Sequence, residues 1–520
     1  MKTPKLITIG IDGGAFELIS PWLDKKELPN FKYMIDNGIA GDLISCLPPV
    51  TCPNWRCYST GKNPGKIGMF WWRNINVQDR SMILPLSSSK KFLDFWTLLS
   101  NDGYRTAVIN TPLTYPPQPI NGYVIAGGPD ASDYKFCYPE SLVTELSSKF
   151  GYRVHSRNSV DFRHGDHTVK DILALIESRF KVAEYLMEKD ELDFVQVTSF
   201  YINVLQHFLW NAEPVKEGWK IIDKWLGRFL EKGTNIMIMS DHGSMPVDVS
   251  LLINCWLEEK GFLVLKKTFA EYLGVLGVNR ERLNFLLDAL KLRRVIKKNV
   301  PSTWKDFIPT RDGRLRGEGG LHKVEWEKSS AFGLGQGPLY MLLDKRHDAY
   351  QTRIEEIASE LQALTFPGSK KKIAKDVKRA DTIYHGPFME FSPDLVIDYN
   401  HGVQIAGIVG KKEIFSKPSL WKADNKREGF FLAYGPDMEK NLHAKSLSIL
   451  DLAPTILHLF DVAISEDMDG KVRQEFFAKD SQAAHRDVKI VQESDLISEE
   501  EEYLEDDKIT QRLKDLGYLD

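Results

Sequence analysis

Short apolar runs rich in β-branched residues alternate along the chain with longer stretches of helical periodicity. The strand-length runs are residues 6–11, 105–110, 193–198, 235–239, 339–343, 394–398 and 429–434. Helical patterns cover residues 92–99, 169–189, 219–231 and 449–460. Strand-length apolar runs separated by helices are typical of βαβ units. The pattern therefore predicts an α/β fold with a mostly parallel central sheet and helices on both of its faces.

Two regions break this alternation and predict the domain organisation. Residues 266–330 are helix-prone and charged, with five Lys or Arg residues between positions 291 and 298. We interpret them as a helical insertion or cap whose basic cluster is a solvated helix face. Residues 481–520 form an acidic tail, with nine Asp or Glu residues among positions 493–507 and a short helix predicted near the end. The catalytic core is then predicted over residues 1–265 and 331–480.

Composition narrows the class of protein. The chain has 520 residues, of which 42% are hydrophobic and 27% charged, values typical of a globular protein. Its net charge of −4 lacks the basic excess expected of a protein that binds a nucleic-acid polymer. No apolar run approaches the roughly 18 residues of a membrane span. The five cysteines have no metal-type spacing, so we expect a reducing, cytoplasmic setting. The sequence leaves the oligomeric state open.

Polar residues follow three of the apolar runs. Asp12 closes the first run, and Asp241 and His242 close another. Asn203 and His207 follow the run that ends near residue 198, and their i, i+4 spacing places them on one face of a helix. Singly, each has an ordinary explanation, such as a turn signal at Asp12 or a core position for His207. Ligands of parallel sheets bind beyond the carboxyl ends of the strands, so the joint placement predicts one site.

A fourth candidate lies near the start of a predicted helix. Pro53 suits the first turn of a helix, so Thr51 lies near that N-terminus, as a simple cap or as part of an anion site. Beside a divalent cation, the Thr51 hydroxyl would act as a nucleophile. Cys52 is the rival nucleophile, ranked lower because no histidine stands in an obvious relation to it.

An ordered set of short motifs carries a family resemblance. They are Ile9-Gly10-Ile11-Asp12-Gly13, Thr60-Gly61-Lys62-Asn63-Pro64-Gly65-Lys66, Leu205-Gln206-His207-Phe208-Leu209-Trp210, Ser240-Asp241-His242-Gly243, Tyr384-His385-Gly386-Pro387, Ser392-Pro393-Asp394-Leu395, Leu432-Ala433-Tyr434-Gly435-Pro436 and Asp451-Leu452-Ala453-Pro454-Thr455. Together they resemble the alkaline phosphatase superfamily, in particular its type I phosphodiesterase/nucleotide pyrophosphatase-like branch. The resemblance implies two divalent metals, usually zinc, around a Thr or Ser nucleophile. It assigns the first metal to Asp12, Thr51, Asp241 and His242, with Thr51 as the nucleophile.

The second metal position departs from the family pattern. The resemblance places an Asp where this sequence has Asn203 and a His where it has Asn425, whereas His207 is retained. Asparagine is neutral and a poor ligand for a borderline-soft metal. We therefore predict a degraded second site and close to one tightly bound divalent ion, zinc first, with Mn²⁺ or Mg²⁺ as alternatives. His207 would stabilise charge or assist proton transfer to the leaving group.

These residues predict a metal-dependent hydrolase or phosphoryl-transfer enzyme. The resemblance implies a small phosphodiester or nucleotide-like phosphate ester as substrate. Two alternatives stay open: a single-metal enzyme with altered group-transfer chemistry in a biosynthetic pathway, or a non-catalytic protein that binds a ligand or partner.

Overall fold

The computed structural model describes residues 2–83, 85, 92–157, 166–266, 320–418, 421–492, 512–513 and 515–517. The predicted insertion lies almost wholly outside these residues, and so does the acidic run of the tail. Of the predicted terminal helix, residues 512, 513 and 515 are described and are helical. The proposed division into core, insertion and tail stays a prediction. In the described part of the chain, no helix is both long and apolar enough to cross a membrane.

Nine strands form the central sheet in the order β19-β2-β18-β9-β1-β8-β5-β6-β7. Their bounds are β1 Leu6–Ile11, β2 Ile39–Ile44, β5 Thr106–Pro112, β6 Gly122–Gly127, β7 Cys137–Tyr138, β8 Phe194–Ser199, β9 Asn235–Ser240, β18 Glu428–Tyr434 and β19 Leu442–Ser448. The contiguous strands β9, β1, β8, β5 and β6 pair in parallel. Every position of β1, β8 and β9 is buried, as expected for central parallel strands covered on both faces. The predicted α/β fold is confirmed.

Three of the predicted strands lie differently from a simple parallel arrangement. Strand β18 pairs antiparallel with both β2 and β9. The runs at 339–343 and 394–398 become β12 (Pro338–Met341) and β14 (Leu395–Tyr399) of a separate antiparallel sheet. The remaining strands of that sheet are β11 (Ala331–Gly333) and β13 (Ala374–Arg379). Apolar runs indicate burial, but they carry no information on strand direction or on which sheet a strand joins.

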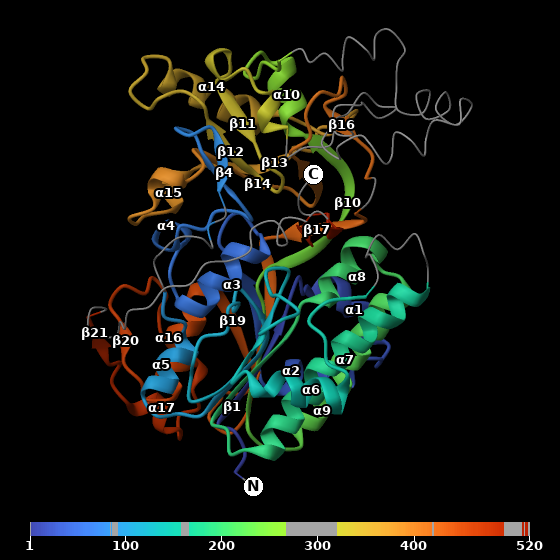
Figure 1. Ribbon diagram of the computed structural model, residues 1–520, viewed down its shortest axis with the longest axis vertical. Helices are drawn as coiled ribbons and strands as arrows, with labels where there is room; N and C mark the ends of the chain where they lie inside the picture. The colour runs from blue at the N-terminus through green and yellow to red at the C-terminus, as the bar shows by residue number, and fades with distance from the viewer. Residues whose placement is uncertain are drawn as a thin grey trace, which may run out of the picture.

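Two groups of helices cover the two faces of the central sheet (Figure 1). One group contains α1 (Phe16–Asp24), α2 (Pro29–Asn37), α6 (Ser141–Phe150), α7 (Asp166–Lys189), α8 (Tyr201–Leu209) and α9 (Glu213–Leu230). The other contains α3 (Thr51–Thr60), α4 (Pro64–Ile67), α5 (Phe95–Asn101), α16 (Leu452–Leu459) and α17 (Gln482–His485). Helix α9 is amphipathic, and its buried residues recur every three or four positions, which explains its packing on the sheet.

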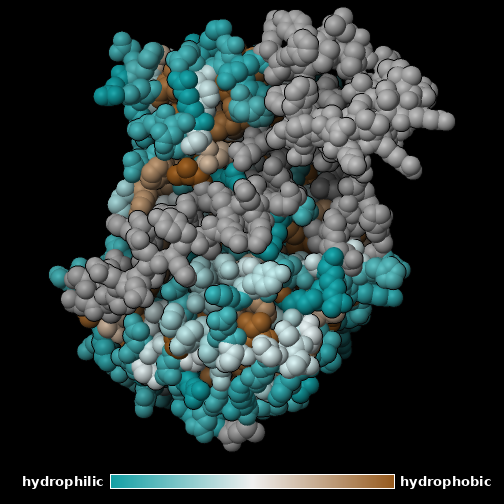
Figure 2. Space-filling model, in the orientation of Figure 1, coloured by the Kyte–Doolittle hydropathy of each residue, from teal (hydrophilic) through white to brown (hydrophobic). Residues whose placement is uncertain are grey.

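A smaller layer lies above the central sheet in Figure 1 and contains the antiparallel sheet with α10 (Ile253–Glu259), α14 (Tyr350–Ala363) and α15 (Ala380–Ile383). The long strand β10 (Gly243–Leu252) rises from the end of β9 towards this layer. It pairs with β15 (Gly402–Ala406), β16 (Phe415–Ser416) and β17 (Ala423–Lys426). Two small ribbons complete the described strands: β3 (Asn74–Asn76) with β4 (Ser81–Ile83), and β20 (Ile464–Ser465) with β21 (Ile490–Val491). Among the described residues, the face in Figure 2 is mostly hydrophilic, and apolar residues show in small patches.

Asp130 is a buried acid just beyond β6, and it gives the fold a pH-dependent contribution to stability. Asp130 is 2% exposed, and its Oδ1 accepts a hydrogen bond from the Leu113 N–H at 3.2 Å. No residue that the structure describes donates a hydrogen bond to its Oδ2. Burial raises the pKa of Asp130 from 3.8 to about 6. The folded protein therefore holds this proton to higher pH than the unfolded chain. The stabilising contribution is present below about pH 4 and is lost as the pH rises through about 6.

Asp130→Asn keeps an oxygen for the Leu113 N–H and removes the charge. We expect the free energy of unfolding of the variant, relative to the wild type, to increase by up to about 3 kcal/mol between pH 4 and pH 7. Urea unfolding of both proteins at the two pH values measures this difference. A difference that is the same at pH 4 and pH 7 would contradict the assignment.

Candidate functional site

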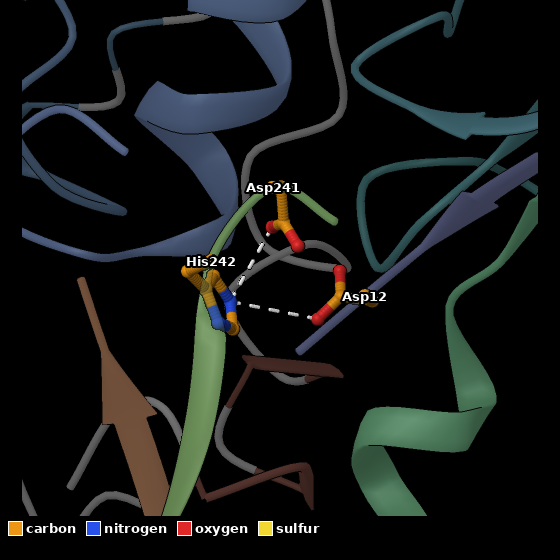
Figure 3. A group of neighbouring side chains, drawn as sticks. All are labelled: Asp12, Asp241 and His242. Atoms are coloured by element: carbon orange, nitrogen blue, oxygen red, sulfur yellow. Dashed lines mark ion pairs between the residues drawn. The ribbon is translucent and has the colours of Figure 1, made fainter. Parts of the chain in front are cut away.

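Three of the sequence-predicted residues converge at the carboxyl edge of the central sheet. Strands β1 and β9 are parallel neighbours in which Ile11 pairs with Ser240, so the residues that follow them lie side by side. Asp12, Asp241 and His242 are all 0% exposed, and one ligand atom from each lies within 4.8 Å of the others. Nε2 of His242 is 3.3 Å from Oδ2 of Asp241 and 3.6 Å from Oδ1 of Asp12. Figure 3 shows the imidazole facing both carboxyl groups.

The protonation of these groups is dominated by burial. Burial raises the pKa of the Asp12 carboxyl to about 7, although three hydrogen bonds to it act in the opposite direction. Burial also raises the pKa of Asp241 well above its usual range, and the neighbouring Asp12 adds to this effect. Burial lowers the pKa of His242 to about 3, so its imidazole is neutral at pH 7. Two buried carboxyl groups side by side become fully ionised only if a positive charge lies close to them.

The tautomer of His242 follows from its second ring nitrogen. Nδ1 lies 3.0 Å from the carbonyl oxygen of Gly243, which can only accept, so Nδ1 carries the proton. Nε2 therefore presents a lone pair to the two carboxyl groups. Within the described part of the chain, Oδ2 of Asp241 is buried without a hydrogen-bond partner. Converging acceptors with this type of outer hydrogen bond fit a divalent cation, and the chemistry of two carboxylates with one imidazole suits zinc and related ions.

Thr51 begins α3, and its hydroxyl lies against the same cluster. Oγ1 is 3.1 Å from Nε2 of His242 and 3.4 Å from Oδ1 of Asp12. The rival Cys52 is buried, and burial raises the pKa of its thiol, which disfavours a thiolate. The geometry therefore brings Thr51 to the cluster and gives Cys52 no activating partner among the groups described around it.

The loop that presents Thr51 is held by Asn54, which the sequence did not single out. Its side-chain oxygen accepts from the Cys46 N–H at 2.8 Å. Its side-chain nitrogen donates to the carbonyl oxygens of Pro48 and Val50, both at 3.0 Å. The only sequence signal for Asn54 was its position three residues after Thr51 on the predicted helix.

Trp55, one turn after Thr51, contacts Asp12 directly. Its indole N–H donates to Oδ2 of Asp12 at 3.0 Å. The ring crosses β1 at Gly10, where an added Cβ would lie 2.5 Å from the indole. Trp55 thus connects the helix that carries Thr51 to the strand that carries Asp12, and Gly10 provides the space for it.

Asn203 is brought to the same cluster, although not in the orientation of a metal ligand. Its side-chain nitrogen donates to Oδ1 of Asp12 at 2.7 Å. Its side-chain oxygen accepts from Nε2 of Gln206 at 3.3 Å and lies 3.2 Å from Oγ of Ser244. Gly13 has a φ of +71°, and a Cβ there would lie 2.2 Å from this oxygen, so only glycine fits. Asn203 therefore presents an N–H to Asp12 where a metal ligand would present an oxygen to a cation.

His207 and Asn425 are engaged with the backbone around the site. Nδ1 of His207 donates to the carbonyl oxygen of Ala423 at 2.9 Å, and the ring stacks on Trp421 with centroids 3.8 Å apart. Burial lowers the pKa of His207 to about 4. The side-chain nitrogen of Asn425 donates to the carbonyl oxygen of Pro49 at 2.8 Å. With the Asn203 amide nitrogen facing Asp12 and no carboxylate of its own, the Asn203, His207 and Asn425 set does not fit a second divalent cation.

Comparison with known proteins gives one family match. The family model for type I phosphodiesterase / nucleotide pyrophosphatase matches residues 6–421. The sequence matches none of the curated proteins with which it was compared.

Solved structures with the same fold include two enzymes of distant sequence. The chain is similar to phosphonoacetate hydrolase from Sinorhizobium meliloti 1021 in complex with phosphonoformate, with 13% identity, a TM-score of 0.56, and 87% of this chain and 94% of that chain covered. It is also similar to human ectonucleotide pyrophosphatase / phosphodiesterase 5, with 13% identity, a TM-score of 0.51, and 91% and 100% of the chains covered. Since the family match spans most of its length, the chain belongs to the type I phosphodiesterase/nucleotide pyrophosphatase family.

Proposed function

We propose that the chain is a cation-dependent enzyme that hydrolyses or transfers the phosphoryl group of a phosphodiester or nucleotide-like ester, with Thr51 as its nucleophile. The observation that carries the proposal is the placement of the Thr51 hydroxyl, 3.1 Å from His242 and 3.4 Å from Asp12, on a buried cluster that fits one divalent cation. Family membership supports the reaction class.

The chemistry follows from the groups around Thr51. Its oxygen attacks phosphorus, the bond from phosphorus to the leaving oxygen breaks, and the phosphoryl group passes to Thr51. Water or a second alcohol then takes the phosphoryl group and regenerates the hydroxyl. Oδ1 of Asp12, 3.4 Å from Oγ1, is the acceptor within reach of the Thr51 proton, since the lone pair of His242 Nε2 would be used to hold the cation. A cation held by Asp12, Asp241 and His242 would supply positive charge that favours the ionised hydroxyl and offsets charge on the phosphoryl oxygens.

Family membership supports a small phosphate ester as the substrate. A cavity of about 420 Å³ lies near the loop before Thr51 and has Pro49 and Met245 in its wall, but Asp12, Thr51, Asp241 and His242 are not among its lining residues. That volume is within the range of about 300–1,000 Å³ that is typical of small-molecule sites. The three bases of the wall, Lys375, Lys426 and Arg427, are each paired with an acid that lines the same wall, so the wall has no excess of positive charge.

His207 is neutral at pH 7, because burial lowers its pKa to about 4. Its one ring proton lies on Nδ1 and is donated to the Ala423 carbonyl oxygen at 2.9 Å, and the ring stacks on Trp421. These contacts support a role in holding β17 against the site and disfavour proton transfer from His207 to the leaving group.

A single-cation group-transfer enzyme is the second candidate function. It is favoured by the Asn203, His207 and Asn425 set, which does not fit a second cation. Both candidates use Thr51, but the second requires an acceptor other than water. Turnover measured with and without an added alcohol acceptor therefore separates it from hydrolysis.

Thr51→Ala tests the nucleophile. We expect turnover of a chromogenic phosphodiester to fall at least about a thousandfold, because no other hydroxyl takes its place. Thr51→Ser keeps the hydroxyl and should retain measurable turnover. Stability should change by only about 1 kcal/mol, because Val50 and not Thr51 is the N-cap of α3, so the change removes no cap side chain. Cys52→Ala is the matched control and should keep wild-type rates. An active Thr51→Ala variant beside an inactive Cys52→Ala variant would reverse the assignment.

Asn203→Asp combined with Asn425→His tests the number of cations. We expect close to one tightly held divalent ion in the wild type, lost on changing Asp241 or His242. The double variant places a new carboxylate near the Asp12 oxygen now 2.7 Å from the amide nitrogen, and two such carboxylates favour a cation between them. We expect its occupancy to rise towards two, with each single change giving less than half of the effect. Elemental analysis measures the stoichiometry. Two tightly bound ions in the wild type would contradict the prediction, and none, together with no turnover after metal is added, would favour a non-catalytic protein.

A further inference from the structure

We propose that Trp219 and Gln206 are positioning residues that fix Asn203 as a hydrogen-bond donor to Asp12, which rests on the proposed function of Asp12 as a cation ligand. These three residues, Trp219, Gln206 and Asn203, are called the amide relay below. All three are 0% exposed. The relay begins on α9, passes through two residues of α8 and ends at the residue that follows β1.

Trp219 determines which group donates and which accepts in each hydrogen bond of the amide relay. An indole N–H can only donate, and Nε1 of Trp219 lies 3.1 Å from the side-chain oxygen of Gln206. The amide of Gln206 is thereby oriented with its nitrogen on the far side. That nitrogen donates to the carbonyl oxygen of Gly13 at 2.9 Å and lies 3.3 Å from the side-chain oxygen of Asn203.

Contacts at both the oxygen and the nitrogen of the Asn203 amide then fix its orientation. Reversing its amide would set two nitrogen donors against each other at Gln206. It would also set an amide oxygen against Oδ1 of Asp12, at the 2.7 Å separation now spanned by a hydrogen bond. Both changes are unfavourable, because buried polar groups need complementary partners. Asn203 is held as a donor, and its N–H occupies the side of Asp12 where a second cation would otherwise bind.

The relay matters for the first cation because it fixes one oxygen of Asp12. Oδ1 is the Asp12 oxygen that lies 3.6 Å from Nε2 of His242, and it is the oxygen that accepts from Asn203. Trp55 holds the other oxygen. Outer hydrogen bonds of this kind orient ligands, and their loss lowers metal affinity roughly 10–100-fold. Gln206 also donates to the Gly13 carbonyl oxygen, and the Gly13 N–H donates to Oδ1 of Asp241 at 3.2 Å. The test therefore has to separate the route through Asn203 from this second route.

A double-mutant cycle with Zn²⁺ tests this dependence on the full-length, metal-stripped protein. Asn203→Leu removes the donor to Asp12 and should weaken Zn²⁺ binding roughly 10–100-fold by calorimetric titration. Trp219→Phe keeps a ring against Phe31 and Phe430 but removes the indole N–H, and should weaken binding by a smaller factor. The combination should be no weaker than Asn203→Leu alone, because the two changes act in series. Should Asn203→Leu not fold, Asn203→Ala takes its place.

Trp225→Phe is the matched control. Trp225 lies on the same helix and is 2% exposed, and its indole nitrogen has no hydrogen-bond partner in the part of the chain that the structure describes. The Trp225→Phe variant should bind Zn²⁺ like the wild type, although it loses an aromatic area similar to that lost in Trp219→Phe. Equal Zn²⁺ affinities for the Trp219→Phe and Trp225→Phe variants, or an additive effect of Trp219→Phe on Asn203→Leu, would overturn the proposal.

A second readout is independent of metal. In the metal-free protein labelled with ¹⁵N-tryptophan, Asn203→Leu should shift the indole N–H resonance of Trp219, identified by its loss in Trp219→Phe. The Trp225 resonance should stay in place. An unshifted Trp219 resonance would overturn the relay. A wild type that binds no Zn²⁺ would instead contradict the proposed function, and the spectra would still decide the relay.

Discussion

The buried carboxyl group of Asp12 is the point to which the other parts of the site are attached. It lies at the end of the central strand β1, where the backbone is fixed by parallel pairing on both sides. Trp55 on α3 and Asn203 on α8 donate hydrogen bonds to it. His242, in the turn between β9 and β10, faces it. A charge in this position is costly without compensation. The groups that surround Asp12 are therefore placed where a nearby positive charge would stabilise its ionised carboxylate.

The substitutions at the second metal position have unequal consequences. Asn203 uses both ends of its amide in hydrogen bonds, and Gly13 leaves space for its oxygen. The amide donates to the Asp12 carboxyl group without bringing a net charge. In the proposed function, the cation held by Asp12, Asp241 and His242 supplies that charge.

Much of the fold and part of the site follow from the sequence. The apolar runs before Asp12 and Asp241 predict parallel strands, and parallel strands bring their carboxyl ends to one edge, so the pair was expected together. The antiparallel direction of β18 was not predicted, because hydrophobicity indicates burial and not strand direction. The orientation of the Asn203 amide was also beyond the sequence. It depends on Gln206, three residues on, but also on Asp12, 191 residues away, and on Trp219 across a helix interface.

Asn425 differs from Asn203 in a way that points to the ligand side of the site. Its nitrogen donates to the carbonyl oxygen of Pro49, two residues before Thr51, whereas its buried side-chain oxygen has no hydrogen-bond partner among the described residues. A buried acceptor without a donor is unfavourable, so such oxygens normally meet water or a ligand. The position that the family pattern gives to a histidine ligand is thus held by a neutral acceptor fastened to the Thr51 loop. An acceptor there is complementary to a hydroxyl or an N–H of a bound molecule, whereas Asn203 is already satisfied within the protein.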